Sequence, residues 1–102
     1  MVINISHLGY KIYVRNIKTP PAEIPHAIAY VENIDNHSSA IYLDFKQLKR
    51  LDYFPNIAHE VTHILQNICF SRDMEFTKET EHMGYLMSYI LNEILGYKYD
   101  TK

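Results

Sequence analysis

Residues 56–70 read NIAHEVTHILQNICF, and more of this chain's structure and chemistry depends on them than on any other segment. Five apolar residues recur there at helical spacing and form one stripe: Ile57, Val61, Ile64, Leu65 and Ile68. Pro55 suits the first turn of this helix, because its fixed φ is already helical. His59, His63 and Gln66 lie on the opposite side of the helical wheel. The pattern predicts an amphipathic helix with one buried face and one polar face.

A second helical pattern follows the first. Ser71-Arg72-Asp73 interrupts the periodicity, and from about Thr77 to Leu95 apolar residues again share one face. They are Met83, Leu86, Met87, Ile90, Leu91, Ile94 and Leu95. Gly96 is predicted as the C-terminal cap of this helix. A short helix is predicted over Phe45–Leu51, so residues 45–102 form a helical half.

Residues 1–44 are instead predicted to be rich in strands. Tyr10–Ile17 alternates loosely and contains β-branched and aromatic residues. Three prolines in Thr19–Pro25 break any regular element. Ala27–Val31 and Ala40–Leu43 flank a stretch of turn formers at 33–39, which predicts a hairpin with a long loop. The expected fold is α+β: a small, mostly antiparallel three-stranded sheet followed by two packed helices, in one domain over residues 1–102.

Composition excludes several classes of partner. A chain of 102 residues suffices for one modest core. The net charge of −2 gives no electrostatic reason to expect nucleic acid or an anionic membrane. The single cysteine, Cys69, cannot form an internal disulfide and fits a reducing compartment. Without a signal-peptide pattern or a membrane-spanning apolar run, the expected location is cytoplasmic.

The segment from His59 to His63 is an HExxH motif. Histidines at i and i+4 are neighbours on one helical face, so their rings converge on a single ion. Glu60 flanks that face and can reach a metal-bound water without ligating the metal. The motif predicts a Zn²⁺ site with His59 and His63 as ligands and Glu60 as the catalytic base. The alternative is a solvated helix face carrying two ordinary histidines.

A catalytic zinc usually has three protein ligands, so a third is expected downstream. Glu81 is the predicted ligand, because it shares a helix face with Gly84 and Ser88, whose small side chains would let the two helices approach closely. His82, one position further on, is the competing candidate. Glu79 lies on another side of the helix, and Glu75 precedes it.

These residues resemble the gluzincin branch of zinc metallopeptidases, and more narrowly the small single-domain HExxH proteins of phages and bacteria. In those proteins the third ligand opens a helix in a pattern like Glu-x-x-Ala-Tyr, which the segment from Glu81 to Tyr85 matches with glycine for alanine. The resemblance implies peptide hydrolysis by a zinc-activated water with Glu60 as general base. It also implies a peptide or protein substrate bound along an edge strand before the metal helix, here Ser39–Leu43.

Two departures from the family pattern bear on function. Larger gluzincins have an acidic residue four positions after the third ligand, where this chain has Tyr85. The domain that stabilises the transition state in large relatives has no counterpart in these residues, which leaves Tyr85, Tyr89 or His82 as candidates for that role. The alternative function is a non-catalytic, metalloprotease-like protein that binds a protein partner, with zinc structural or absent.

Overall fold

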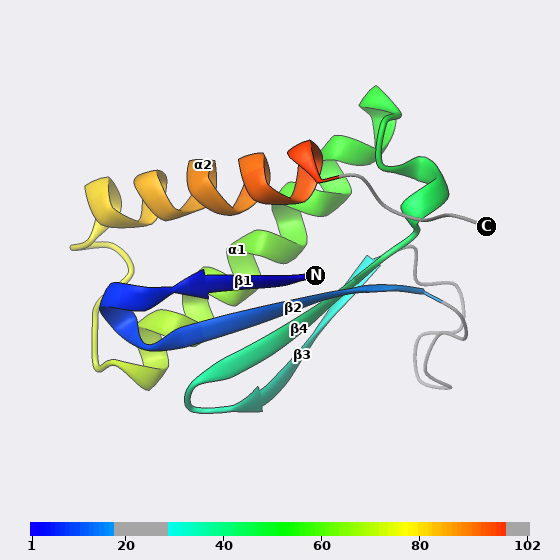
Figure 1. Cartoon of the computed structure of the whole chain (residues 1–102). Helices are drawn as coiled ribbons and strands as arrows, with labels where there is room; N and C mark the ends of the chain where they lie inside the picture. Colours follow the sequence, from blue (N-terminus) through cyan, green and yellow to red (C-terminus); the bar gives the residue numbers. More distant parts are fainter. Residues whose placement is uncertain (18–28, 98–102) are drawn as a thin grey trace.

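The computed structural model describes residues 1–17 and 29–97, which form one sheet with two helices on the same side of it (Figure 1). The strands are β1 (Val2–Ile5), β2 (Tyr10–Asn16), β3 (Ala29–Asp35) and β4 (Ser38–Leu43), and the α-helices are α1 (Phe54–Ser71) and α2 (Thr80–Gly96). Three 3₁₀ turns complete the order: η1 (Ser6–Leu8), η2 (Phe45–Gln47) and η3 (Leu51–Tyr53). The expected α+β class is confirmed.

The sheet differs from the expected one in strand number and pairing. It has four strands in the order β1-β2-β4-β3. β1 and β3 pair antiparallel with their neighbours, but β2 and β4 run parallel. The prediction of three mostly antiparallel strands is therefore wrong in detail. β1 was missed because it is only four residues long, with just Ile3 and Ile5 buried.

Several predicted boundaries also need correction. β3 and β4 continue through the predicted long loop and meet at a two-residue turn, Asn36-His37, so the loop is wrong. Ser39–Leu43 was expected at the sheet edge, but it belongs to β4, which pairs on both sides. The predicted helix over 45–51 is replaced by η2 and η3. Gly96 is the last residue of α2 and lacks the positive φ of a glycine cap. The proline-rich stretch at 19–25 lies outside the described residues.

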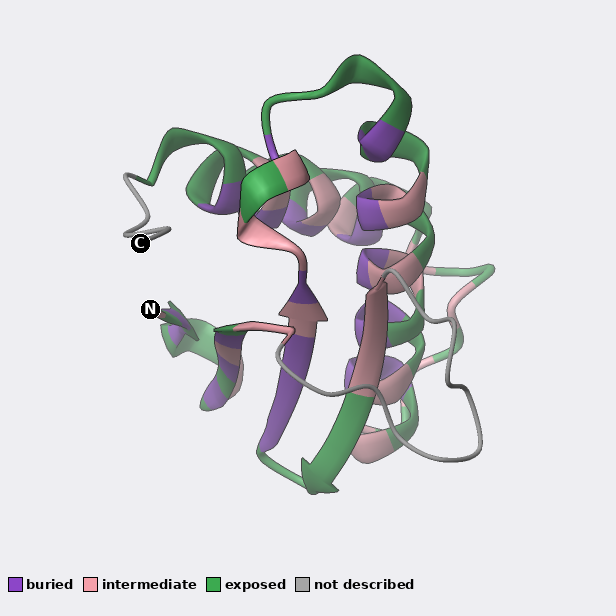
Figure 2. Cartoon of the chain, turned by 90° about the vertical axis from the view of Figure 1, so that its right-hand side faces the viewer, coloured by how far each residue is buried: buried purple, intermediate pink, exposed green. Residues whose placement is uncertain are grey.

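The core lies between the sheet and the helices. All five residues of the predicted α1 stripe are at most 1% exposed, which confirms that face of the helix. Figure 2 shows the buried residues of α1 facing β4 and the exposed ones facing away from it. α2 contributes Met83, Leu86, Ile90 and Ile94, whereas Leu95 is 42% exposed. Among the described residues, no helix has the length and apolar character that a membrane span requires.

Arg72 joins the end of α1 to two distant turns. Its guanidinium donates hydrogen bonds to the carbonyl of Leu8 at 2.9 Å and to that of Asn36 at 2.7 Å. It also lies 3.1 Å from Nδ1 of His37 and 5.8 Å from the ring centroid of Tyr10. Arg72, which immediately follows α1, thus fixes the end of the helix against both η1 and the β3–β4 turn.

Replacing Arg72 tests this anchoring role. We expect Arg72→Met to lower the free energy of unfolding by about 1.5–3 kcal/mol, because it removes hydrogen bonds made by a charged donor. Urea unfolding followed by circular dichroism measures the loss. Arg50→Met is the matched control, because among the described residues the Arg50 side chain pairs only with the exposed Asp52, and it should cost less than about 1 kcal/mol. Equal losses in the two variants would contradict the anchoring role.

The β3–β4 turn makes stability depend on pH through Asp35. Its carboxylate accepts hydrogen bonds from the His37 N–H at 2.7 Å and the Ser38 hydroxyl at 2.9 Å, which hold its pKa below the ordinary 3.8. Because the folded state lowers this pKa, the stabilisation is fully present above about pH 3.8 and is lost as the pH falls through the lowered value. We expect Asp35→Ala to lower the urea midpoint at pH 6, and this deficit to shrink below pH 3.8. Asp35→Asn, which keeps the acceptor without the charge, should differ from Asp35→Ala by an amount independent of pH.

Candidate metal centre

His59 and His63 present their ring nitrogens to each other on the exposed face of α1. The two Nε2 atoms are 3.2 Å apart, and the rings meet edge to face with centroids 4.8 Å apart. Two nitrogens bound to one tetrahedral zinc, at bond lengths of about 2.0–2.1 Å, are about 3.3 Å apart. Both side chains are exposed, so an ion can reach them. This spacing fits a shared zinc ion with little rearrangement.

Gln66 orients one of these rings. Nδ1 of His63 lies 3.3 Å from Oε1 of Gln66. A carbonyl oxygen only accepts, so in the His63 tautomer that uses this contact Nδ1 is the donor and the Nε2 lone pair is available to a metal. A partner on the second ring nitrogen is a regular feature of metal-binding histidines. The sequence interpretation placed Gln66 on the same face but gave it no role; its position three residues after His63 was the available signal.

Glu60 completes a cluster of three possible ligands. One ligand atom from each of His59, Glu60 and His63 lies within 4.8 Å of the others. The Glu60 side chain is partly buried, and this burial raises its pKa, while the neighbouring His63 and His59 lower it. A divalent cation held by the histidines would also act to lower it. The distances between the ligand atoms place the Glu60 carboxylate near the ion position that the motif predicts.

Tyr53, which was not predicted as part of the site, is close enough to Glu60 to feel its charge. Only 1% of it is exposed, and its hydroxyl accepts a hydrogen bond from the Asp44 N–H at 2.8 Å. Burial raises its pKa, and the charges of Asp44 and Glu60 add to the rise. Tyr53 thus connects the segment that follows β4 to the side of α1 that carries Glu60.

The structure does not bring Glu81 into this cluster. Its carboxylate projects from the first turn of α2, where Thr80, Glu81, Gly84, Tyr85 and Ser88 line an open depression of about 390 Å³. Glu81, Gly84 and Ser88 share one face of α2, as predicted, but the predicted close approach of this face to α1 is wrong. This face is exposed, and a Cβ added at Gly84 would meet nothing within 4 Å, so it makes no close approach to α1. The ligand role of Glu81 stays a prediction.

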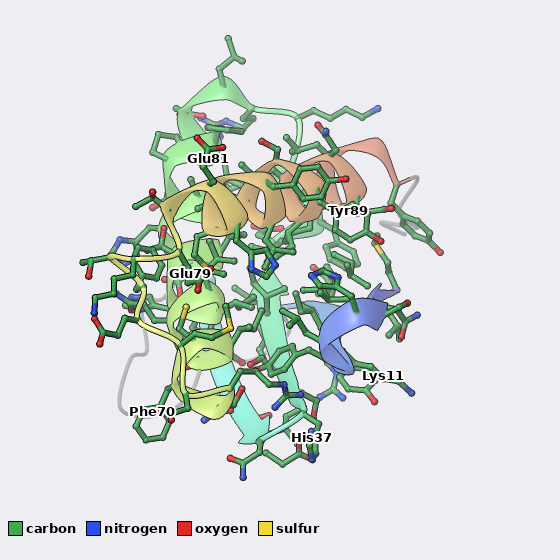
Figure 3. All side chains as sticks on the ribbon, turned by 90° about the vertical axis from the view of Figure 1, so that its left-hand side faces the viewer. Lys11, His37, Phe70, Glu79, Glu81 and Tyr89 are labelled. Atoms are coloured by element: carbon green, nitrogen blue, oxygen red, sulfur yellow. The ribbon has the colours of Figure 1, made fainter. Side chains whose placement is uncertain are left out.

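The competing ligand, His82, is held elsewhere. Its Nε2 lies 2.9 Å from Nε2 of His7, and its Nδ1 lies 3.9 Å from a carboxylate oxygen of Glu79. Figure 3 shows Glu79 and Glu81 on different sides of the start of α2. Within the described part of the chain, the Glu81 side chain has no hydrogen bond or ion pair. Of the two candidates, Glu81 therefore has the uncommitted side chain.

The three candidates for stabilising a transition state also differ in whether their polar groups already have partners. The Tyr89 hydroxyl donates to the carbonyl of Asn4 at 3.3 Å, and His82 is paired with His7. Tyr85 is 72% exposed and lines the same depression as Glu81. Only Tyr85 combines exposure with a hydroxyl that has no partner among the described residues.

No protein-family model, curated protein or solved structure matches this chain. The resemblance to the gluzincins therefore rests on the motif residues themselves, and the arguments for function rest on their geometry.

The Gln66 contact leads to a test of the metal centre. We expect Gln66→Ala to weaken zinc binding about 10- to 100-fold, because His63 loses the acceptor that fixes its tautomer. Calorimetric titration of zinc into metal-free protein measures the affinity. Gln66→Glu keeps an acceptor at the same position and should retain tight binding. Equal affinities for Gln66→Ala and the unaltered protein would show that Gln66 does not orient the ligand.

Proposed function

We propose that this protein is a zinc-dependent peptide hydrolase whose metal ligands include His59 and His63. The observation that carries the proposal is the 3.2 Å separation of their Nε2 atoms, with the Glu60 carboxylate in the same cluster. When bound, zinc supplies a Lewis acid for the peptide carbonyl and lowers the pKa of a water molecule.

Glu60 is the proposed general base. Its carboxylate accepts a proton from the attacking water and returns it to the leaving amine, so one side chain serves both proton transfers. The Glu60 side chain is partly buried, which limits the positions that its carboxylate can take. Its place beside the histidines supports this role over that of a free surface carboxylate.

Glu81 is the proposed third ligand. Two features support it over His82: Glu81 is exposed and uncommitted, whereas His82 is paired with His7 and lies beside Glu79. Glu81 lies in the first turn of α2, and the side chains of α2 and α1 share one core, so the proposal requires the Glu81 side chain to change position when the metal binds.

The substrate is proposed to lie along β3 (Ala29–Asp35), because β4 is inside the sheet. Among the described residues β3 pairs only with β4, so its other side presents unpaired backbone groups. β3 also contacts α1, the helix that carries the histidines. An extended peptide can add to such an edge through main-chain hydrogen bonds.

A second candidate function is a metalloprotease-like protein that binds a protein partner without cleaving it. It is favoured by the engagement of Tyr89 and His82, which leaves Tyr85 as the one uncommitted candidate for stabilising an oxyanion. Oxyanion stabilisation is usually a large share of catalysis, so its absence would leave a binding protein.

The two functions are separated by changing the base while keeping the metal. We expect Glu60→Gln to retain zinc but to lower cleavage of a mixed peptide library at least about 100-fold, the effect typical of a general base. His59→Ala and His63→Ala should each lose the zinc ion held by these two histidines, and the activity with it. Mass spectrometry of the peptides and elemental analysis of protein purified without a metal-affinity tag provide the readouts. If Glu60→Gln retains zinc and cleaves the peptides no more slowly than the unaltered protein, the partner-binding function is favoured.

The third ligand has its own test. Glu81→Gln should weaken the tightest-bound zinc at least about tenfold, because it removes a charged oxygen ligand. His82→Gln should leave that affinity unchanged, and Glu93→Gln, an exposed carboxylate later in α2, is the matched control. Loss of affinity in His82→Gln but not in Glu81→Gln would reverse the assignment.

A further inference from the structure

We propose that His7 and His82 form a second binding site for a divalent transition-metal ion, with Glu79 orienting His82. The two rings come from residues 75 positions apart in sequence, and their Nε2 atoms are 2.9 Å apart. The ring centroids are 5.2 Å apart and the planes are inclined at 36°. Both Nε2 atoms therefore point at the same small volume between η1 and the first turn of α2.

The chemistry of this group suits a metal such as Zn²⁺ or Cu²⁺. Imidazole nitrogen is a preferred ligand for both ions. A separation of 2.9 Å is that of an N–H···N hydrogen bond, and opening it by about 0.4 Å reaches the spacing of two ligands on a tetrahedral zinc. The His82 side chain is 28% exposed and His7 is also exposed, so an ion can enter and water can complete its coordination.

Glu79 gives the site a further feature of metal centres. Its carboxylate lies 3.9 Å from Nδ1 of His82, the ring nitrogen that does not face His7. A carboxylate hydrogen-bonded to a ligating histidine fixes the ring tautomer and makes the ligating nitrogen more basic, and Glu79 would do so once metal binding shortens this separation to hydrogen-bond length. The three residues thus provide two ligands and an orienting group, in the order carboxylate, histidine, metal position, histidine.

This site is separate from the His59–His63 centre and does not depend on its function. Neither His7 nor His82 belongs to the cluster formed by His59, Glu60 and His63. An ion here would join η1, which follows the first strand, to α2. The Tyr89 hydroxyl of α2 donates to the carbonyl of Asn4 in β1, the strand that leads into η1, so the metal would reinforce an existing contact between α2 and the N-terminal segment.

Zinc stoichiometry tests the proposal. Metal-free full-length protein is titrated with zinc by calorimetry, and we expect two bound ions, with the His7–His82 site the weaker. A His59→Ala/His63→Ala variant should keep one ion, and His82→Gln or His7→Gln should each also keep one. Combining His82→Gln with the double variant should remove both. His37→Gln, an exposed histidine outside both sites, is the matched control and should bind two.

The titration is paired with thermal unfolding of the His59→Ala/His63→Ala variant, in which only the proposed site is left. Zinc should raise its melting temperature, and adding His7→Gln should weaken the residual binding at least about tenfold and abolish the rise. Circular dichroism at low temperature confirms that each variant is folded. The proposal is overturned if the folded double variant binds no zinc, or if its binding survives both His7→Gln and His82→Gln. If instead the His59–His63 centre binds no metal, the unaltered protein will bind one ion, and His59→Ala/His63→Ala will still bind it.

Discussion

The burial of the α1 stripe is the constraint on which the rest of this structure depends. Its five apolar side chains are at most 1% exposed and lie against the sheet and α2. An α-helix turns about 100° per residue, so burying that stripe fixes the rotation of α1 about its own axis. With this rotation His59 and His63 must face solvent, and Glu60 must lie at the boundary between core and solvent. The candidate metal centre is thus positioned by packing on the opposite side of the helix.

This dependence explains which parts could be predicted from the sequence. The α1 stripe and the exposure of His59 and His63 follow from periodicity within one helix, and both agree with the structure. The convergence of the two imidazoles is also local, because residues four apart share a helical face. Most of the α2 face was predicted for the same reason. Leu95 is 42% exposed although its neighbour Ile94 is buried, so the edge of the buried face runs between these two residues.

Features set by contacts between distant segments were not predictable. The parallel pairing of β2 with β4 places β4 inside the sheet, and nothing in residues 38–43 specifies which strands lie on either side. The small residues beside Glu81 suggested close helix packing, yet small residues are equally compatible with an exposed face, as Gly84 shows. The proximity of His7 to His82 arises only after the sheet and α2 have packed, so no local pattern in the sequence predicts it.

The two histidine pairs therefore differ in how metal binding would couple to folding. His59 and His63 need only a helical turn, and an unfolded chain that forms this turn briefly can already bind an ion weakly. An ion that also binds the unfolded state stabilises the fold less than its affinity for the native state suggests. His7 and His82, separated by 75 positions, are brought together only by tertiary structure. Bringing them together in the unfolded chain carries the loop-closure entropy of that separation. An ion at His7–His82 would therefore bind the native state more selectively than one at His59–His63. Even if it binds more weakly, a larger fraction of its binding free energy would then contribute to the stability of the fold.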